Sequence, residues 1–223
     1  MSTPSTTGNT PRQDPPGTSL TERRKAETRM EIARAAAGLF VRQGLRATRA
    51  EDIAHAAGIA PRTFYRYFAT KEEAVAPLYA AGAQRWAEAV RAAPAALAVP
   101  EALEHAVRHT LTPGEGVSAA SWEWVRTLIH LADTSPALRK VWAEVCQSSE
   151  DVLAGILADR IGPDNVAPAP HLRFAAAVAG AAVRVAVESW AAGTASASQA
   201  EGPAALALRN LADLRGFAWG QRA

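Results

Sequence analysis

Hydrophobic positions recur along most of this 223-residue chain with the period of an α-helix. In the first periodic segment, Ile32, Ala36, Leu39 and Phe40 fall on one face and form an apolar stripe. No segment alternates as a half-buried strand does, and alanine, the strongest helix former, dominates the apolar residues. The pattern predicts an all-α fold.

Start and stop signals divide the chain into separate helices. Three segments open with Ser or Thr followed three residues later by Glu, the capping-box spacing; they begin at Ser19, Thr48 and Thr70. Gly44 and Gly58 stand where a helix would end. The expected helices are 19–43, 48–57, 61–68, 70–90, 101–111, 119–133, 137–160, 171–192 and 203–220.

Charge and composition predict three regions, with boundaries after residues 17 and 71. Residues 1–17 are rich in Pro, Ser, Thr and Gly without an apolar period, so we expect a disordered tail. Residues 18–71 carry a net charge of +6 and residues 72–223 a net charge of −4. This asymmetry indicates that the first folded region meets a polyanion. The alternative is that its basic residues only solvate a helix face.

The short stretch PRTFYRYF, residues 61–68, combines aromatic and cationic side chains. With the preceding helix and the turn at Gly58, it has the pattern of a helix-turn-helix. Phe64 and Phe68 are four apart and can share a core-facing side. Arg62 and Arg66 are also four apart, a like-charge pair that costs stability unless it faces an anion. Arginine can donate two hydrogen bonds to guanine, so we expect this helix to contact DNA.

The expected DNA contacts extend beyond the two arginines. Hydroxyl groups and lysine suit phosphate oxygens, and the start of the preceding helix can offer free N–H groups to a phosphate. The expected set is Thr48, Arg49, Pro61, Arg62, Thr63, Tyr65, Arg66, Tyr67 and Lys71.

The run from Arg24 to Val75 resembles the DNA-binding domain of TetR-type transcriptional regulators. The matching stretches are ARAAAGLFVRQGLRAT, EDIAHAAGIAPRTFYRYF and KEEAV, in order and with their spacing intact. Arg49 and Ala50 depart from the small hydroxyl or branched apolar residues usual there. Ala60 replaces the Ser or Thr that often caps the recognition helix.

The resemblance implies a homodimeric regulator that binds a palindromic operator and leaves it when a small molecule binds the C-terminal domain. It also implies a dimer interface built from the helices near 171–192 and 203–220. The residues agree: 174–190 are apolar nearly all round, and Leu208, Leu211, Leu214 and Phe217 offer a matching stripe. The alternative is that both are core helices of a monomer.

The middle helices are rich in tryptophan, and aromatic walls with a few polar groups are typical of small-molecule pockets. The alternative is that the indoles fill the core. Trp122 and Trp124 are two apart on one helix, so at most one need face a cavity. Arg184 and Glu188 are expected to form an ion pair, with an anionic ligand of Arg184 as the alternative. The candidate ligand residues are Trp86, Trp122, Trp124, His130, Trp142, Cys146 and Arg184.

A weaker resemblance covers residues 138–190, which are similar to TetR-type regulators whose ligand domain is grouped as acyl-CoA-like. It names no ligand for this chain. A ligand-independent DNA-binding protein, or an activator rather than a repressor, stays open as an alternative.

Other function classes find little support in the sequence. His105 and His109 are four apart, but no third metal ligand lies at a motif spacing, and no nucleophile elbow or phosphate-binding glycine loop occurs. An α-helical enzyme is therefore the remote alternative, and we expect no cofactor and no metal. One cysteine, no signal-peptide pattern and no apolar run long enough for a membrane span predict a cytoplasmic protein.

Overall fold

A computed structural model describes residues 19–114, 119–162, 170–217 and 219. These parts are helical and contain no strand, as expected, and the tail predicted for residues 1–17 lies outside them. The helices are α1 (Leu20–Gln43), α2 (Ala50–Ala56), α3 (Pro61–Tyr67), the short 3₁₀ helix η1 (Glu73–Val75), α4 (Ala76–Ala92), α5 (Val99–Leu111), α6 (Ala119–Thr134), α7 (Pro136–Ile161), α8 (Pro170–Ala192) and α9 (Pro203–Asp213).

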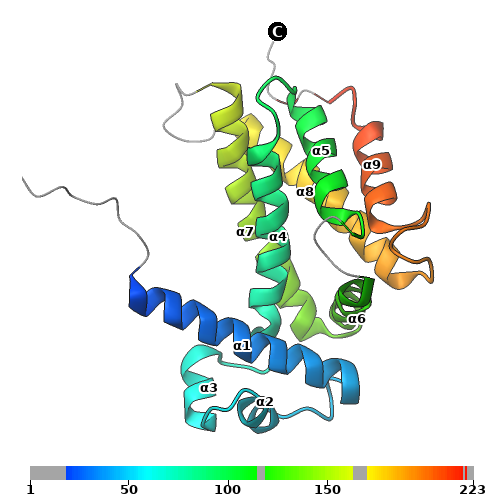
Figure 1. Cartoon of the computed structure of the whole chain (residues 1–223). Helices are drawn as coiled ribbons and strands as arrows, with labels where there is room; N and C mark the ends of the chain where they lie inside the picture. Colours follow the sequence, from blue (N-terminus) through cyan, green and yellow to red (C-terminus); the bar gives the residue numbers. More distant parts are fainter. Residues whose placement is uncertain (1–18, 115–118, 163–169, 218, 220–223) are drawn as a thin grey trace, which may run out of the picture.

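We call α1–α3 the head and α4–α9 the body. Figure 1 shows the head at one end, with α4 and α7 running side by side away from it and α5, α8 and α9 gathered at the far end. Helix α6 is seen nearly end-on in this view, and it packs against α7, α8 and α1. The molecule therefore has a small end and a larger helical bundle, and α1 joins the two through its contacts with η1, α4 and α6.

Two glycines provide the turns that shape the head. Gly44 ends α1 with φ 83°, and Gly58 lies in the α2–α3 turn with φ 67°. A side chain is strained in this left-handed region, so glycine is required at both places. The Ser19 hydroxyl accepts from the N–H of Glu22 at 3.2 Å and caps the start of α1 as predicted.

The predicted cap at Thr48 is wrong. Arg49 is the N-cap of α2, and its N–H donates to the Asp52 carboxylate at 2.8 Å. The Thr48 side chain is fully buried, and its hydroxyl donates to the carbonyl of Gly44 at 2.9 Å. Asp52 follows Arg49 by three residues, the same spacing as Glu51 after Thr48. Because Asp52 accepts from the N–H of Arg49, the helix begins one residue later than predicted.

The start of α4 and the end of α9 also differ from the predictions. The helix expected from residue 70 begins as the 3₁₀ turn η1, and Thr70 still accepts from the N–H of Glu73 at 3.2 Å. Helix α9 ends at Asp213 rather than near 220, so Leu214 and Phe217 lie in the turns that follow it. Gly216, a poor helix former, favours this early end.

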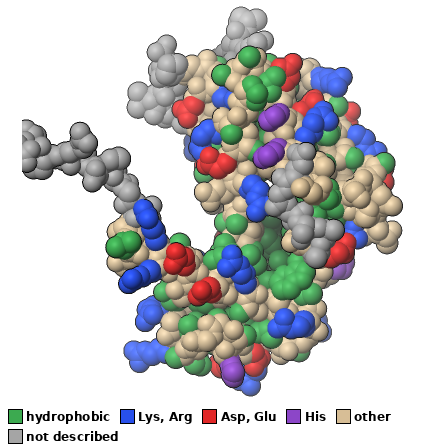
Figure 2. All heavy atoms as spheres, viewed as in Figure 1, with side chains coloured by type: hydrophobic (Ala, Val, Ile, Leu, Met, Phe, Trp, Pro, Cys, Tyr) green, Lys and Arg blue, Asp and Glu red, His purple; other side chains and the backbone are tan. Residues whose placement is uncertain are grey.

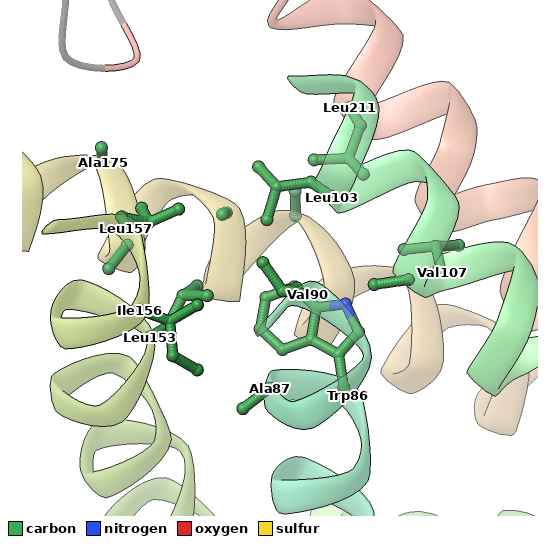
Figure 3. Close-up of a cluster of buried hydrophobic side chains, with 14 of the residues drawn as sticks. Trp86, Ala87, Val90, Leu103, Val107, Leu153, Ile156, Leu157, Ala175 and Leu211 are labelled. Carbon is green, nitrogen blue, oxygen red and sulfur yellow. The ribbon is translucent and has the colours of Figure 1, made fainter. Parts of the chain in front are cut away.

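The body is organised around one large apolar cluster. In Figure 3, Trp86 and Val90 of α4 lie between Leu153 of α7 and Leu103 of α5, with Leu211 of α9 above them. Of these, Val90, Leu103 and Leu153 are completely shielded from solvent. The burial of such side chains supplies most of the stabilisation of a helical bundle.

A second cluster joins the head to the body. Phe64 and Phe68 of the head belong to the same buried group as Tyr79, Leu128 and Val141 of the body. The boundary expected after residue 71 falls between α3 and η1, inside this shared cluster, and stays a prediction.

Helix α8 is apolar enough to need a separate test for a membrane span. Among the described residues it alone has the length and composition to cross one, with a mean hydropathy of 1.3 over 18 residues, contrary to the expectation from the sequence. Its alanines raise this value. Core helices pass the same test, and α8 packs against α6, α7 and α9 with 44% of that window buried.

One arginine fastens the loop between α4 and α5. The guanidinium of Arg160 donates to the carbonyls of Ala93, Pro94 and Leu97 at 2.9–3.0 Å, and to that of Val90 at 3.4 Å. Arginine suits this role because its planar fork presents several donors at once.

Replacing Arg160 with alanine is expected to lower the free energy of unfolding by about 2–4 kcal/mol, because several carbonyls lose a charged donor. Arg160→Lys keeps the charge without the fork and should recover less than half of this loss. Urea denaturation followed by circular dichroism measures both. Arg173→Ala, which removes one exposed ion pair with Asp151, is the control and should change stability by at most about 0.5 kcal/mol. Equal stability of the two alanine variants would contradict the role of Arg160.

Candidate DNA-binding surface and ligand cavity

Helix α3 separates its core residues from its polar residues as the sequence predicted. Phe64 is fully buried and Phe68 is 3% exposed, whereas Arg62 and Arg66 are exposed and Tyr65 is 52% exposed. The Phe64 and Phe68 rings lie 5.8 Å apart and hold the inner side of the helix. Its outer side is left with side chains that can read bases and bind phosphates.

The remaining candidates surround α3 in different environments. Pro61 is exposed at the first position of the helix, and Ala60 before it provides no side-chain cap, as expected. Thr63 and Tyr67 are half-buried. The Arg49 side chain is 77% exposed, and its Nε lies 3.6 Å from the Glu51 carboxylate, an exposed ion pair that a phosphate can replace.

Thr48 and Lys71 have structural roles. The ammonium group of Lys71 donates to the carbonyls of Leu45 and Thr48 at 2.7 and 2.8 Å, which fastens the α1–α2 turn. Thr48 is buried, so its side chain is not available to DNA, and a contact through the backbone at this helix start stays a prediction. Lys71 has one N–H left for a phosphate.

Arg29 of α1 supports the end of α3, a contact that the sequence did not predict. Its guanidinium donates to the carbonyl of Tyr67 at 3.1 Å and lies 4.6 Å from the centre of the Phe68 ring. The end of α3 is thereby tied to α1. Because this contact spans 38 residues, no local spacing could have indicated it.

The body contains a half-open cavity of about 800 Å³. Its walls come from α4, α6, α7 and α8, with Arg34 of α1 and Leu111 of α5 at its edges. Figure 2 shows a hollow lined by hydrophobic side chains beside α4, with Lys and Arg side chains near it. Its size and apolar character suit a drug-sized organic molecule.

Most of the residues predicted to bind a ligand line this cavity. They are Trp86, Trp122, Trp124, Trp142, Cys146 and Arg184. His130 is exposed and outside the lining, so the structure does not bring it together with the other six. It follows Ile129, which lines the cavity, by one residue, and a turn of about 100° per residue carries it to the outer face of α6.

Both tryptophans of α6 contribute to the cavity, contrary to the expectation that at most one need do so. Trp122 is 4% exposed and its ring meets that of Trp190 edge to face at 5.5 Å. Trp124 is 41% exposed and lies close to Gly38 of α1. The two indoles leave the helix in different directions, and each is long enough to reach a separate part of the wall.

A polar group interrupts the apolar wall where α7 meets α8. Arg184 and Glu188 form the expected ion pair at 3.1 Å, and the Trp142 indole N–H donates to Glu188 at 2.7 Å. Glu150 lies against Gly180 across the same wall. Burial raises the pKa of the Glu150 carboxyl, and the charge of Arg184 acts in the opposite direction.

Tyr79 connects this wall to α6. Its hydroxyl donates to the carbonyl of Leu128 at 2.8 Å, and its ring meets that of Trp142 at 5.1 Å. Burial raises the pKa of the Tyr79 phenol, which therefore stays protonated as a donor. Three lining residues were not predicted from the sequence: Tyr79, Arg34 and Arg85. In the sequence, Tyr79 belongs to an apolar stripe and the two arginines resemble ordinary surface residues.

The environment of Cys146 leads to a test of pH dependence. Burial raises the pKa of its thiol from 9.0 to about 12. At pH 8 about one thiol in ten thousand is then ionised, against about one in ten for a pKa of 9.0, and the thiolate is the reactive form.

The reaction of Cys146 with an aromatic disulfide reagent at pH 8 is therefore expected to be at least about a hundredfold slower in the folded chain than in urea. The folded rate should keep rising between pH 9 and pH 11 because the thiolate fraction still grows there. Cys146 is the chain's one cysteine, so absorbance of the released thiol follows it alone. A folded rate equal to the unfolded rate would contradict the raised pKa.

Comparison with known proteins identifies the family. Residues 32–76 match the family profile of the bacterial regulatory proteins of the tetR family, and residues 97–201 match the profile of the MftR C-terminal domain. The chain is 33% identical over 196 residues to the HTH-type transcriptional regulator TcmR of Streptomyces glaucescens, covering 84% of this chain and 81% of that protein. The chain belongs to the TetR family. It is accordingly a DNA-binding transcriptional regulator, and the resemblance noted in the sequence is confirmed.

Two solved structures share the fold. FadR of Thermus thermophilus, a transcriptional repressor solved in complex with lauroyl-CoA, is 25% identical with a TM-score of 0.54, covering 87% of this chain and 97% of that chain. GusR of Salmonella enterica is 19% identical with a TM-score of 0.55, covering 86% and 95%. The acyl-CoA-like grouping stays a prediction, since the C-terminal profile that matches is that of MftR.

Proposed function

We propose that this TetR-family regulator is a cytoplasmic homodimeric repressor that binds a palindromic operator and leaves it when a small molecule enters the cavity of the body. In this division of labour, residues 18–71 read DNA and residues 72–223 bind the ligand and the second protomer. The observation that carries the proposal is the exposed polar side of α3, held from behind by Phe64 and Phe68.

The proposed contacts have distinct roles. Arg62 lies in the first turn of α3, the part of a recognition helix that meets base edges, and Arg66 follows one turn later. Tyr65, Thr63 and Tyr67 carry hydroxyls suited to phosphates. Arg49, Pro61 and Lys71 complete the surface and lie against the sugar-phosphate backbone of the DNA.

The second protomer is proposed to pack on α8 and α9. Phe174 is 62% exposed and Val185 is 45% exposed, and Ala177 and Ala181 lie between them on the same side of α8. Exposed apolar residues at this spacing, separated by small ones, fit a partner helix at short range. Two-fold symmetry then presents two copies of α3 to successive major grooves.

The cavity favours a ligand-responsive regulator over a ligand-independent one. It is bounded by Arg34 and Trp124, which lie on or against α1 of the head. A ligand there can act on the head only if it prefers one head position energetically. We propose no catalytic activity for these residues.

Fluorescence anisotropy with the genomic DNA flanking its own gene tests the proposal. We expect saturable binding that weakens steeply with salt, because phosphate contacts release counterions. The Arg62→Ala chain provides the control for specific recognition. Binding that is absent, or that does not respond to salt, would refute the proposed DNA surface.

A further inference from the structure

The charged residues around the cavity are unevenly distributed. Three arginines, Arg34, Arg85 and Arg184, line it together with one acid, Glu150. Arg184 is already paired with Glu188. The cavity is therefore apolar within but carries more positive than negative charge along its lining.

Arg34 and Arg85 differ from most arginines of the body. Both are exposed, and neither has a hydrogen bond or ion pair with any residue in the described parts of the chain. By contrast, Arg91, Arg108 and Arg209 each pair with a nearby glutamate. Within the described residues, the cavity thus has two cations at its border without a charged partner.

The surroundings make these two charges effective toward a ligand. Arg85 directly precedes Trp86, which is 6% exposed and belongs to the body core. Apolar walls of low dielectric concentrate the field of a charge at their edge, so an anion gains more there than on an open surface. A ligand with only neutral groups would form no ion pair with either arginine.

We propose that the effector is an amphipathic organic anion. Its apolar body occupies the aromatic chamber among Trp86, Trp122 and Trp142, and its acidic group lies at the border with Arg34 and Arg85. This inference rests on the proposed function, because it names the chemistry of the molecule that the same cavity receives.

The positions of the two arginines also connect binding with regulation. Arg34 belongs to α1 of the head and Arg85 to α4 of the body. An anion held by both joins the two helices and favours the head position in which both contacts are made. A neutral ligand of the same shape fills the chamber but lacks this link, so it exerts less influence on the head.

Two probes with the same ring system test the charge requirement. 8-Anilinonaphthalene-1-sulfonate is an anion, and N-phenyl-1-naphthylamine is its neutral counterpart without the sulfonate. We expect the anion to bind the native chain about tenfold more tightly than the neutral probe by fluorescence titration. Arg34→Gln and Arg85→Gln should each lower the affinity for the anionic probe by about three- to tenfold. The affinity for the neutral probe should stay within about twofold of its value in the native chain.

Arg215→Gln is the matched control, since Arg215 is exposed, has no ion pair in the described parts of the chain and lies outside the cavity lining. It should leave both probes unchanged. Protection of Cys146 from alkylation places a probe in the cavity, because its side chain is part of the lining.

The possible results distinguish a failure of the anion inference from a failure of the proposed function. If both probes protect Cys146 but bind equally, or if the arginine variants affect both probes alike, the anion inference is wrong and the cavity remains a ligand site. If neither probe binds or protects Cys146, the ligand part of the proposed function fails as well. Unchanged binding of the neutral probe in a variant shows that its chamber is intact.

Discussion

A chain carrying Arg62→Ala is expected to bind its operator at least about 30-fold more weakly than the native chain. One two-donor contact to guanine contributes about 1–3 kcal/mol, and the symmetric dimer loses it twice. Arg62 is exposed in the first turn of α3 while Phe64 fixes the helix from behind, so its removal should leave the fold unchanged.

The salt dependence of the same variant distinguishes two roles for Arg62. If it reads a base, affinity falls mainly for the specific sequence and the salt slope is kept. If it binds a phosphate, binding weakens for all sequences and the slope falls by about one for each lost contact. Arg108→Ala removes an equal charge from the remote helix α5 and is the control. If the Arg62→Ala chain binds the operator with native affinity, the proposal that α3 reads the operator is wrong.

A glutamate at Val185 is expected to produce the second large effect. In the proposed dimer, the exposed apolar side of α8 meets its symmetry copy, so Val185→Glu places two unpaired carboxylates against apolar surface. Light scattering at micromolar concentration should then show a monomer. Operator affinity should fall by at least about a hundredfold, because two linked half-site contacts become independent.

Val152→Glu makes the same replacement at a control position. Val152 is 48% exposed on α7, in a different helix from the proposed contact surface. Its variant should remain a dimer with native operator affinity. A dimer that persists in the Val185 variant would move the interface away from this side of α8.

Local patterns predicted most of the helices and the composition of α3. Helical periodicity and punctuation by Pro and Gly place the bounds of α1, α3 and α5–α8 within about two residues, because these signals act within one or two turns. The same locality explains the inner position of Phe64 and Phe68. The N-cap of α2 was predicted one residue too early, because Arg49 with Asp52 has the same spacing as Thr48 with Glu51.

Contacts between distant segments could not be predicted in this way. Arg29 binds the end of α3, Lys71 binds the α1–α2 turn and Arg160 fastens the α4–α5 loop, each across more than 20 residues of sequence. Nor could composition tell that His130 faces outward or that Arg34 borders the cavity. Such placements depend on how helices cross, which a single sequence does not encode locally.

The buried cluster shared by the head and the body limits how freely the two can be exchanged between relatives. Phe68 and Tyr79 belong to one apolar group, so a chimera joined after residue 71 would set side chains of one protein against an unmatched surface of another. A graft that keeps α4 with its own α1, and matches Leu128 and Val141 as well, preserves that contact. If the outer face of α3 reads the operator as proposed, changing that face is a better way to alter DNA specificity than transplanting a domain.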